Sequence, residues 1–261
     1  MPGDGAHPPL SLLRQNGCSV VNLAGLAALL SLVFALVVGA RWVRSHHPAF
    51  ACWTLGLLIF AAAAASQSLG ESRGFESHVI LFQLFYLLGG ALGVIYLALG
   101  TLYLLAPRRV AVICTAVLLI FTVVVAVDAF VAPIDRAKLA TPAGILGGAY
   151  SNAVLLQAAV VFFNIVGTVV FAGGAAWSGW RYIRERAGVD RILCNVLLTA
   201  GALVVAFGFS AAKTVGSSID PLGGYEAAGM AVMFAGFLVL GRVRLAAAGK
   251  STLPPAAARA G

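Results

Sequence analysis

The sequence predicts an all-α integral membrane protein with seven transmembrane helices, its N-terminus outside and its C-terminus cytoplasmic. The composition, the runs of uncharged residues and the placement of arginine and lysine lead to this prediction. Of the 261 residues, 61% are hydrophobic and 10% are charged, whereas charged residues make up about a quarter of a soluble domain. Mean hydropathy is +0.98. Such a chain is solvated mostly by lipid.

The first four spans are bounded by charged residues or histidine. A bilayer core about 30 Å thick requires about 20 apolar residues per helix, so we interpret each uncharged run of that length as one span. The bounds are Arg14 and Arg41, His47 and Glu71, His78 and Arg108, and Arg109 and Asp128. The first run is longer than the apolar core of a signal peptide, about 7–15 residues. We therefore expect a retained helix, with cleavage as the alternative.

The last three spans are bounded less evenly. We place the fifth at about residues 153–178, because the proline and glycines at 142–148 are typical of a loop. The sixth is residues 192–212. Only 15 residues separate Glu226 from Arg242, so the seventh is short at about 1.5 Å per residue. We expect these two side chains to reach toward the headgroups, or the bilayer to be thinner there.

The positive charges fall on alternate loops. Twelve lie on one set of loops: Arg41, Arg44, Arg108, Arg109, Arg181, Arg184, Arg186, Arg191, Arg242, Arg244, Lys250 and Arg259. By the positive-inside rule these loops are cytoplasmic. The sequence thus predicts an extracellular segment at 1–17, a seven-helix domain at 18–245 and a disordered cytoplasmic tail at 246–261.

Several classes of function are disfavoured. The net charge of +8 follows from the topology and from attraction to anionic lipid, so we expect the bilayer, and no nucleic acid, as a partner. The chain has no HExxH, GxSxG, CxxC or phosphate-binding glycine loop. We expect no cofactor and no metal, and the sequence favours a protein that is not an enzyme.

A short internal repeat suggests two related halves. Arg41-Trp42-Val43-Arg44 is matched 140 residues later by Arg181-Tyr182-Ile183-Arg184. Helices 1–3 and 5–7 would then form two three-helix bundles of the same orientation, joined by the fourth helix. Such parallel repeats occur in transporters.

Glycine spacing predicts where helices approach closely. Gly201 and Gly208 lie seven residues apart in the sixth span, and Gly229 and Gly236 do so in the seventh. Small residues at such spacing allow backbones to touch in membranes. We therefore expect close packing of these spans.

Candidate ligand-binding residues form a polar layer near the outer face. Lys213 closes the sixth span, Glu226 opens the seventh, and the others lie in the outer third: Gln67, Gln83, Asp128 and Asn164. Ionisable residues within a membrane usually face a cavity or one another. The alternative for Lys213 is a surface anchor, because its long stem reaches the headgroups.

Two functions remain open from the sequence. The first is a multi-pass protein of the cell membrane that binds a small molecule or lipid in this outward layer, as a sensor or accessory subunit. Its basic cytoplasmic loops could contact a protein partner. The alternative is a small-solute transporter or channel built from the two repeats.

Overall fold

Helices make up most of the residues that the computed structural model of the chain describes. These are 22–186, 188–215 and 220–251, with the backbone alone for 213–215, 220–221 and 240–251. The elements, in order, are α1 (Leu23–Ser45), α2 (Pro48–Arg73), α3 (Val79–Leu84), η2 (Phe85–Leu92), α4 (Gly93–Leu105), α5 (Arg108–Val131), η3 (Arg136–Ala140), η4 (Gly144–Gly148), α6 (Val154–Arg184), α7 (Val189–Val215) and α8 (Asp220–Ser251).

Seven of these stretches are long and apolar enough to cross a membrane, as predicted. They are Leu23–Ser45, Pro48–Arg73, Val79–Leu105, Arg108–Val131, Val154–Arg184, Val189–Ala212 and Leu222–Val239. The segment at 1–17 lies outside the described residues. So do residues 252–261 of the predicted tail, whereas α8 continues past residue 245 to Ser251.

Local sequence signals set the helix ends. The Asn22 side chain accepts from Gly25 N at 3.1 Å and begins α1, as expected of an N-cap. His46 then leaves the helix with φ 50°, and Pro48 opens α2. Proline suits a first helical position because its missing N–H would have no helical partner there.

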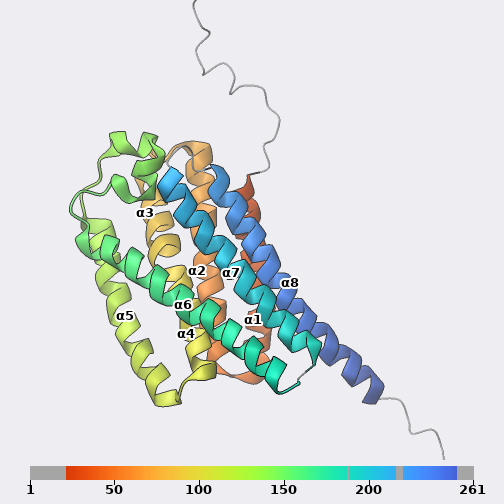
Figure 1. Cartoon of the computed structure of the whole chain (residues 1–261). Coiled ribbons are helices and arrows are strands. Elements are labelled where there is room, and N and C mark those ends of the chain that lie inside the picture. The colour runs from red at the N-terminus through yellow and green to blue at the C-terminus, as the bar shows by residue number, and fades with distance from the viewer. Residues whose placement is uncertain (1–21, 187, 216–219, 252–261) are drawn as a thin grey trace, which may run out of the picture.

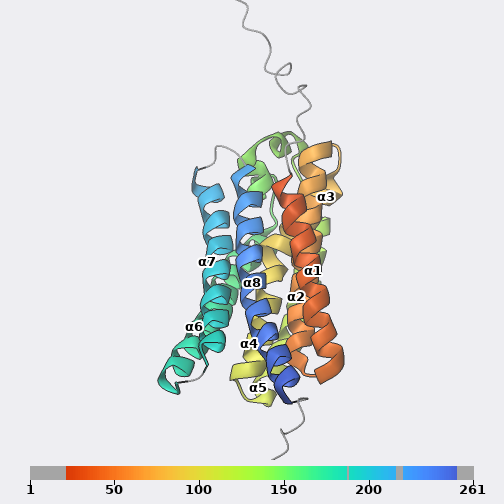
Figure 2. The same ribbon diagram turned by 90° about the vertical axis from the view of Figure 1, so that its right-hand side faces the viewer.

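Six of the seven described spans form a closed ring. In order around the ring, each packs on the next: α1, α2, the α3–η2–α4 helix, α6, α7 and α8, which returns to α1. Helix α5 stands outside the ring against α4 and α6, and it lies at the edge of the bundle in Figure 1. The view in Figure 2 shows α7, α8 and α1 side by side.

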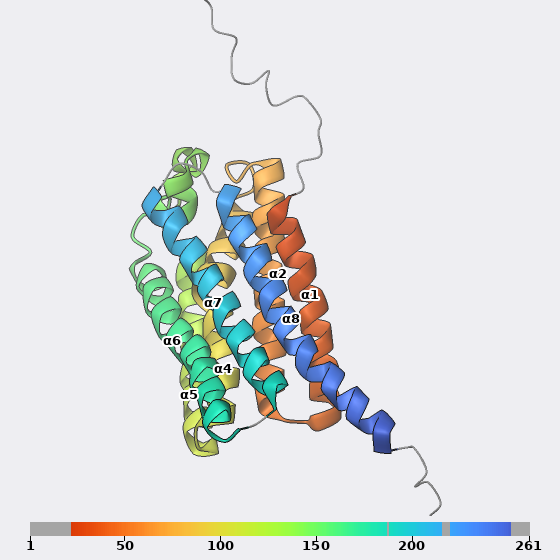
Figure 3. The same cartoon turned by 45° about the vertical axis from the view of Figure 1, so that its right-hand side comes forward.

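The two ends of the bundle differ in chemistry. The turns from α1 to α2, α4 to α5 and α6 to α7 share one end, which we call the arginine-rich end: Arg41, Arg44, Arg108, Arg109, Arg181, Arg184, Arg186 and Arg191. The start of α1, the α2–α3 turn and the segment 132–153 lie at the other end, which we call the loop end (Figure 3).

The predicted glycine packing joins α7 to α8. A Cβ added at Gly201 would lie 2.5 Å from the carbonyl oxygen of Gly229, and one at Gly229 would lie 2.7 Å from that of Gly201. Gly208 faces Tyr225, and a Cβ at Gly236 would lie 2.8 Å from that of Leu197. The close approach expected from the heptad spacing is confirmed.

The seventh span differs from the expectation at its start. Helix α8 begins at Asp220, so Glu226 lies in its second turn, within the span Leu222–Val239. Glu226 is 8% exposed. The expectation that its side chain reaches toward the headgroups is therefore wrong, because α8 begins at Asp220 and places the acid inside the helix.

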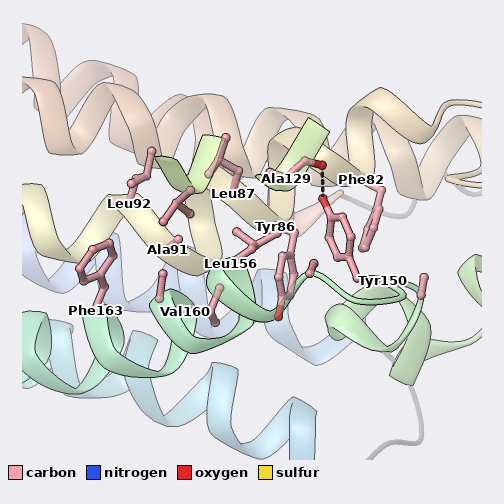
Figure 4. Close-up of a cluster of buried hydrophobic side chains, with 14 of the residues drawn as sticks. Phe82, Tyr86, Leu87, Ala91, Leu92, Ala129, Tyr150, Leu156, Val160 and Phe163 are labelled. Atoms are coloured by element: carbon pink, nitrogen blue, oxygen red, sulfur yellow. Dashed lines mark hydrogen bonds between the residues drawn. The ribbon is translucent and has the colours of Figure 1, made fainter. Parts of the chain in front are cut away.

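An aromatic cluster holds the segment 132–153 on the loop end. The Tyr150 ring lies 5.0 Å from that of Phe82 and 5.4 Å from that of Tyr86, between ring centres. Its hydroxyl donates to the Ala129 carbonyl at 3.1 Å (Figure 4). Burial raises the pKa of Tyr150 above its ordinary value, so the phenol stays protonated and keeps this bond.

Candidate functional site

A π-helical segment widens the third span beside the ring axis. In η2 the Gly93 N–H donates to the Leu88 carbonyl, five residues back. The amide Nδ2 of Asn164, on α6, donates to the Gly90 carbonyl and to the Val160 carbonyl, the second at 2.7 Å. Segments of this kind often mark functional sites. Asn164 therefore links α6 to an irregular turn of the third span.

A buried carboxylate faces the same region from α8. Among the described residues, the Oε2 atom of Glu226 has no hydrogen-bond partner. Burying such a group without a partner is costly, and ionisable residues within a membrane are functional-site candidates for that reason.

Asn164 and Glu226 line one cavity of about 60 Å³. A water molecule requires roughly 10–15 Å³ of such space, so the cavity has room for about four. Most of its wall is apolar, contributed by the ring helices: Phe60, Phe85, Phe171, Phe209, Met230 and Met233. We call it the Glu226 cavity. It combines a few polar groups with an apolar wall, as small-molecule sites do.

Helix α2 contributes a second polar pair, the buried Gln67 and the half-buried Glu71. Gln67 is 0% exposed, and its Nε2 donates to Glu71 Oε1 at 2.8 Å. In the described part of the chain, Gln67 Oε1 has no partner. Glu71 lies close enough to Glu226 for the two acidic groups to interact electrostatically. The groups left open, Gln67 Oε1 and Glu226 Oε2, are both hydrogen-bond acceptors.

Two of the predicted site residues bind backbone at the junction of α5 with its neighbours. Gln83 Nε2 donates to the Ala129 carbonyl at 3.1 Å. Asp128 Oδ2 accepts from Leu156 N at 2.8 Å, in the first turn of α6. This carboxylate thus satisfies a backbone N–H that has no partner within its own helix.

Lys213 lies in the last turn of α7, and its side chain is outside the described part. Phe209, four residues earlier, lines the Glu226 cavity. The backbone of Lys213 therefore lies about one helical turn beyond this part of the wall, toward the loop end.

The structure brings Asn164 and Glu226 to one cavity, and it adds Glu71, which sequence reasoning treated only as the end of a span. The i, i+4 spacing of Gln67 and Glu71 could have shown that they share a helix face. Thr168, also on the cavity wall, carries no comparable signal. Comparison with protein-family models, curated proteins and solved structures gives no match.

Proposed function

We propose that this chain is a multi-pass protein of the cell membrane that binds a small molecule or lipid in the Glu226 cavity, as a sensor or accessory subunit. The N-terminus is outside and the C-terminus cytoplasmic, as the arginine distribution indicates. The observation that carries the proposal is the buried Glu226 Oε2, which has no hydrogen-bond partner among the described residues.

The chemistry of the cavity selects a class of ligand. Glu226 Oε2, on the cavity wall, accepts hydrogen bonds. Gln67 Oε1 and the acidic Glu71, on α2, lie outside the cavity lining and add two more acceptor groups. A positively charged amine would satisfy these acceptors, because bonds between charged groups are the stronger ones. The aromatic and methionine wall suits a short alkyl group on that amine, because the cavity of about 60 Å³ has room for about four water molecules.

All six predicted site residues would take part in this function, at different distances from the ligand. Glu226, Gln67 and Asn164 would contact the ligand or its waters, and Lys213 would stand toward the mouth of the cavity. Asp128 and Gln83 would hold the α5–α6 junction that borders the loop end.

Thermal unfolding of the detergent-purified protein tests this function. We would screen apolar primary amines beside neutral alcohols of the same shape. An amine that binds the folded state raises the melting temperature. At a concentration of 100 times its Kd it adds about 2.7 kcal/mol to the free energy of unfolding. Glu226→Gln should lose this response, while Glu185→Gln, an acid paired with Arg181 at the opposite end, should keep it. Equal responses of the two variants would refute the amine site.

The orientation requires its own experiment. In a cysteine-free background, Ser77→Cys in the exposed α2–α3 turn should react with a membrane-impermeant thiol reagent added to intact cells. Glu185→Cys should react only after the membrane is opened. The reverse pattern would invert the proposed topology.

A second candidate, a transporter, is favoured by a row of cavities along the ring axis. A cavity of about 20 Å³ shares Leu97, Phe171 and Met233 with the Glu226 cavity. A cavity of about 330 Å³ shares Trp53, Leu198 and Phe237 with the small one. The row lies between helices from the two halves of the chain, where repeat transporters place their substrates.

Flux measurements separate the two candidates. If reconstituted vesicles take up an amine that stabilises the protein, and Glu226→Gln abolishes uptake, the chain is a transporter. Binding without uptake would leave the sensor or accessory function.

A further inference from the structure

The largest of the three axial cavities opens at the arginine-rich end. It has a volume of about 330 Å³, within the range of roughly 300–1,000 Å³ typical of small-molecule sites. Its polar and aromatic wall comes from the ends of several ring helices: Arg41, Trp53, Trp177, Arg181, Tyr182 and Asn195. We call it the arginine cavity. The ligand site proposed above does not involve it, although the transporter alternative includes it in the row of cavities.

Arg41 is held at the wall by two aromatic rings. Its guanidinium carbon lies 5.1 Å from the centre of the Phe50 ring and 5.4 Å from that of the Phe237 ring. Such cation–π contacts orient a guanidinium group. Arg41 is thus fixed at the wall of the cavity.

Arg181 contributes a second guanidinium from the last turn of α6. Its Nε lies 2.9 Å from Glu185 Oε1, and the two side chains are 61% and 52% exposed. An exposed ion pair contributes little free energy, about 0–1 kcal/mol, so Arg181 can turn from Glu185 to a ligand. None of the described residues that line the cavity is acidic.

Tryptophan gives the cavity a rigid apolar side. Trp53 Nε1 donates to the Leu97 carbonyl at 3.0 Å, which fixes the plane of its indole. The Trp177 ring lies 4.9 Å from that of Trp180, between ring centres. Indoles near a helix end suit the level of lipid headgroups, where one edge is apolar and the other is wet.

From this arrangement we propose that the arginine cavity binds a phosphate-bearing molecule. Arg41 and Arg181 would bind the phosphate, because planar guanidinium groups match phosphate oxygens in pairs. Trp53 and Trp177 would contact the carbon part of the same molecule. Basic pockets between transmembrane helices recognise anionic headgroups in this way. A phospholipid or a soluble phosphate ester would offer the same chemistry.

Intrinsic tryptophan fluorescence of the detergent-purified full chain provides the assay, because two indoles line the cavity. The probes are dihexanoyl phosphatidylglycerol, dihexanoyl phosphatidylcholine, glycerol 3-phosphate and inorganic phosphate. We expect a saturable change with the anionic probes and at least tenfold weaker binding of phosphatidylcholine. Arg181→Gln should weaken anion binding at least fivefold, and Arg41→Gln should do the same.

Arg184→Gln is the matched control. Arg184 lies on the same helix, nearly one turn after Arg181. Its guanidinium carbon is 4.5 Å from the centre of the Trp180 ring, and the residue does not line the cavity. This variant should bind as the wild type does. Because Arg181 is exposed, its substitution should leave folding intact even if Arg41→Gln unfolds the protein.

The outcomes separate the two sources of phosphate. Binding of phosphatidylglycerol without glycerol 3-phosphate assigns a lipid site, and binding of both assigns a site for soluble phosphate esters as well. Equal binding of phosphatidylcholine and phosphatidylglycerol would overturn the proposal. So would equal weakening by Arg184→Gln and Arg181→Gln.

Discussion

Helices α8 and α5 are both apolar spans, yet α8 is part of the ring and α5 stands outside it. Half of the α8 span (50%) is buried inside the protein, against 17% of the α5 span. Helix α5 is nevertheless the more hydropathic of the two. Lipid solvates apolar side chains as well as a protein core does, so apolar composition alone does not draw a helix inward.

The small residues account for the difference. Helix α8 carries Gly229 and Gly236 against the backbone of α7, whereas α5 contains no glycine. An apolar groove of about 770 Å³ separates much of α5 from α4 and α6. Hydrogen bonds such as those of Tyr96 with Thr122 and Tyr103 with Thr115 join α5 to α4. Backbone proximity thus holds α8, and side-chain hydrogen bonds help to hold α5.

The largest effect should come from breaking the α7–α8 contact with Gly201→Ala. The new methyl group would lie 2.5 Å from the Gly229 carbonyl oxygen, and this overpacking should cost about 1–3 kcal/mol of stability. The melting temperature in detergent would fall accordingly. Gly173→Ala, on α6 where nothing lies within 4 Å, is the control and should change little. If the melting temperature falls equally in Gly201→Ala and Gly173→Ala, glycine is needed for the backbone conformation of these helices and not for the contact with α8.

Asp128→Ala should loosen the start of α6 from α5. The variant leaves Leu156 N without its 2.8 Å acceptor, and loss of such a cap costs about 0.5–2 kcal/mol. Chemical denaturation in mixed micelles would measure the loss. Asp128→Asn keeps an oxygen acceptor and should recover at least half of it. If the asparagine variant is as unstable as the alanine variant, the charge rather than the hydrogen bond is responsible.

Glu226→Met should change stability in the opposite direction. Replacing a buried charged group by an apolar side chain of similar volume is often neutral or stabilising, and here we expect a gain of about 1 kcal/mol, since Oε2 leaves a partnerless acceptor among the described residues. A higher melting temperature with loss of the amine response would indicate that the acid is kept for binding. A marked loss of stability would show instead that Glu226 supports the fold.

The smallest effect should come from Tyr103→Phe. Its hydroxyl bonds Thr115 Oγ1 at 2.9 Å, but Thr115 also donates to the Ala111 carbonyl at 2.7 Å and stays satisfied. Hydrogen bonds between membrane helices are worth about 0.6 kcal/mol on average. Amide hydrogen exchange should rise in α5 and not in α8. Faster exchange in α8 would show that α5 supports the ring.

Hydropathy was sufficient to predict the number of spans and most of their bounds. A charged side chain is costly in the hydrocarbon core of the bilayer, so a charged residue that ends an apolar run also marks the end of a span. The same reasoning failed at Glu226. The sequence does not show whether a charged residue ends a helix or lies inside it. For Glu226 the answer depends on whether the preceding turn, Asp220 to Gly223, is helical, and the structure shows that it is.

The site could be predicted only in part, because its neighbours come from distant helices. Asn164 was found as a polar residue within a span, but its bond to the Gly90 carbonyl depends on a π-helical turn 74 residues earlier. Asp128 was found in the same way. Its role as a cap depends on the path of residues 132–153, which hydropathy does not report.

We expect the small axial cavity to block ions along the ring axis. Its wall includes Phe34, Leu57 and Phe171, with no polar lining among the described residues. Narrow apolar constrictions empty of water and stop ions without any moving part. An ion entering this cavity would lose its water of hydration, and no polar side chain there would replace that water. We therefore expect vesicles that contain the protein to hold their ion gradients, although cavities lie on both sides of this constriction.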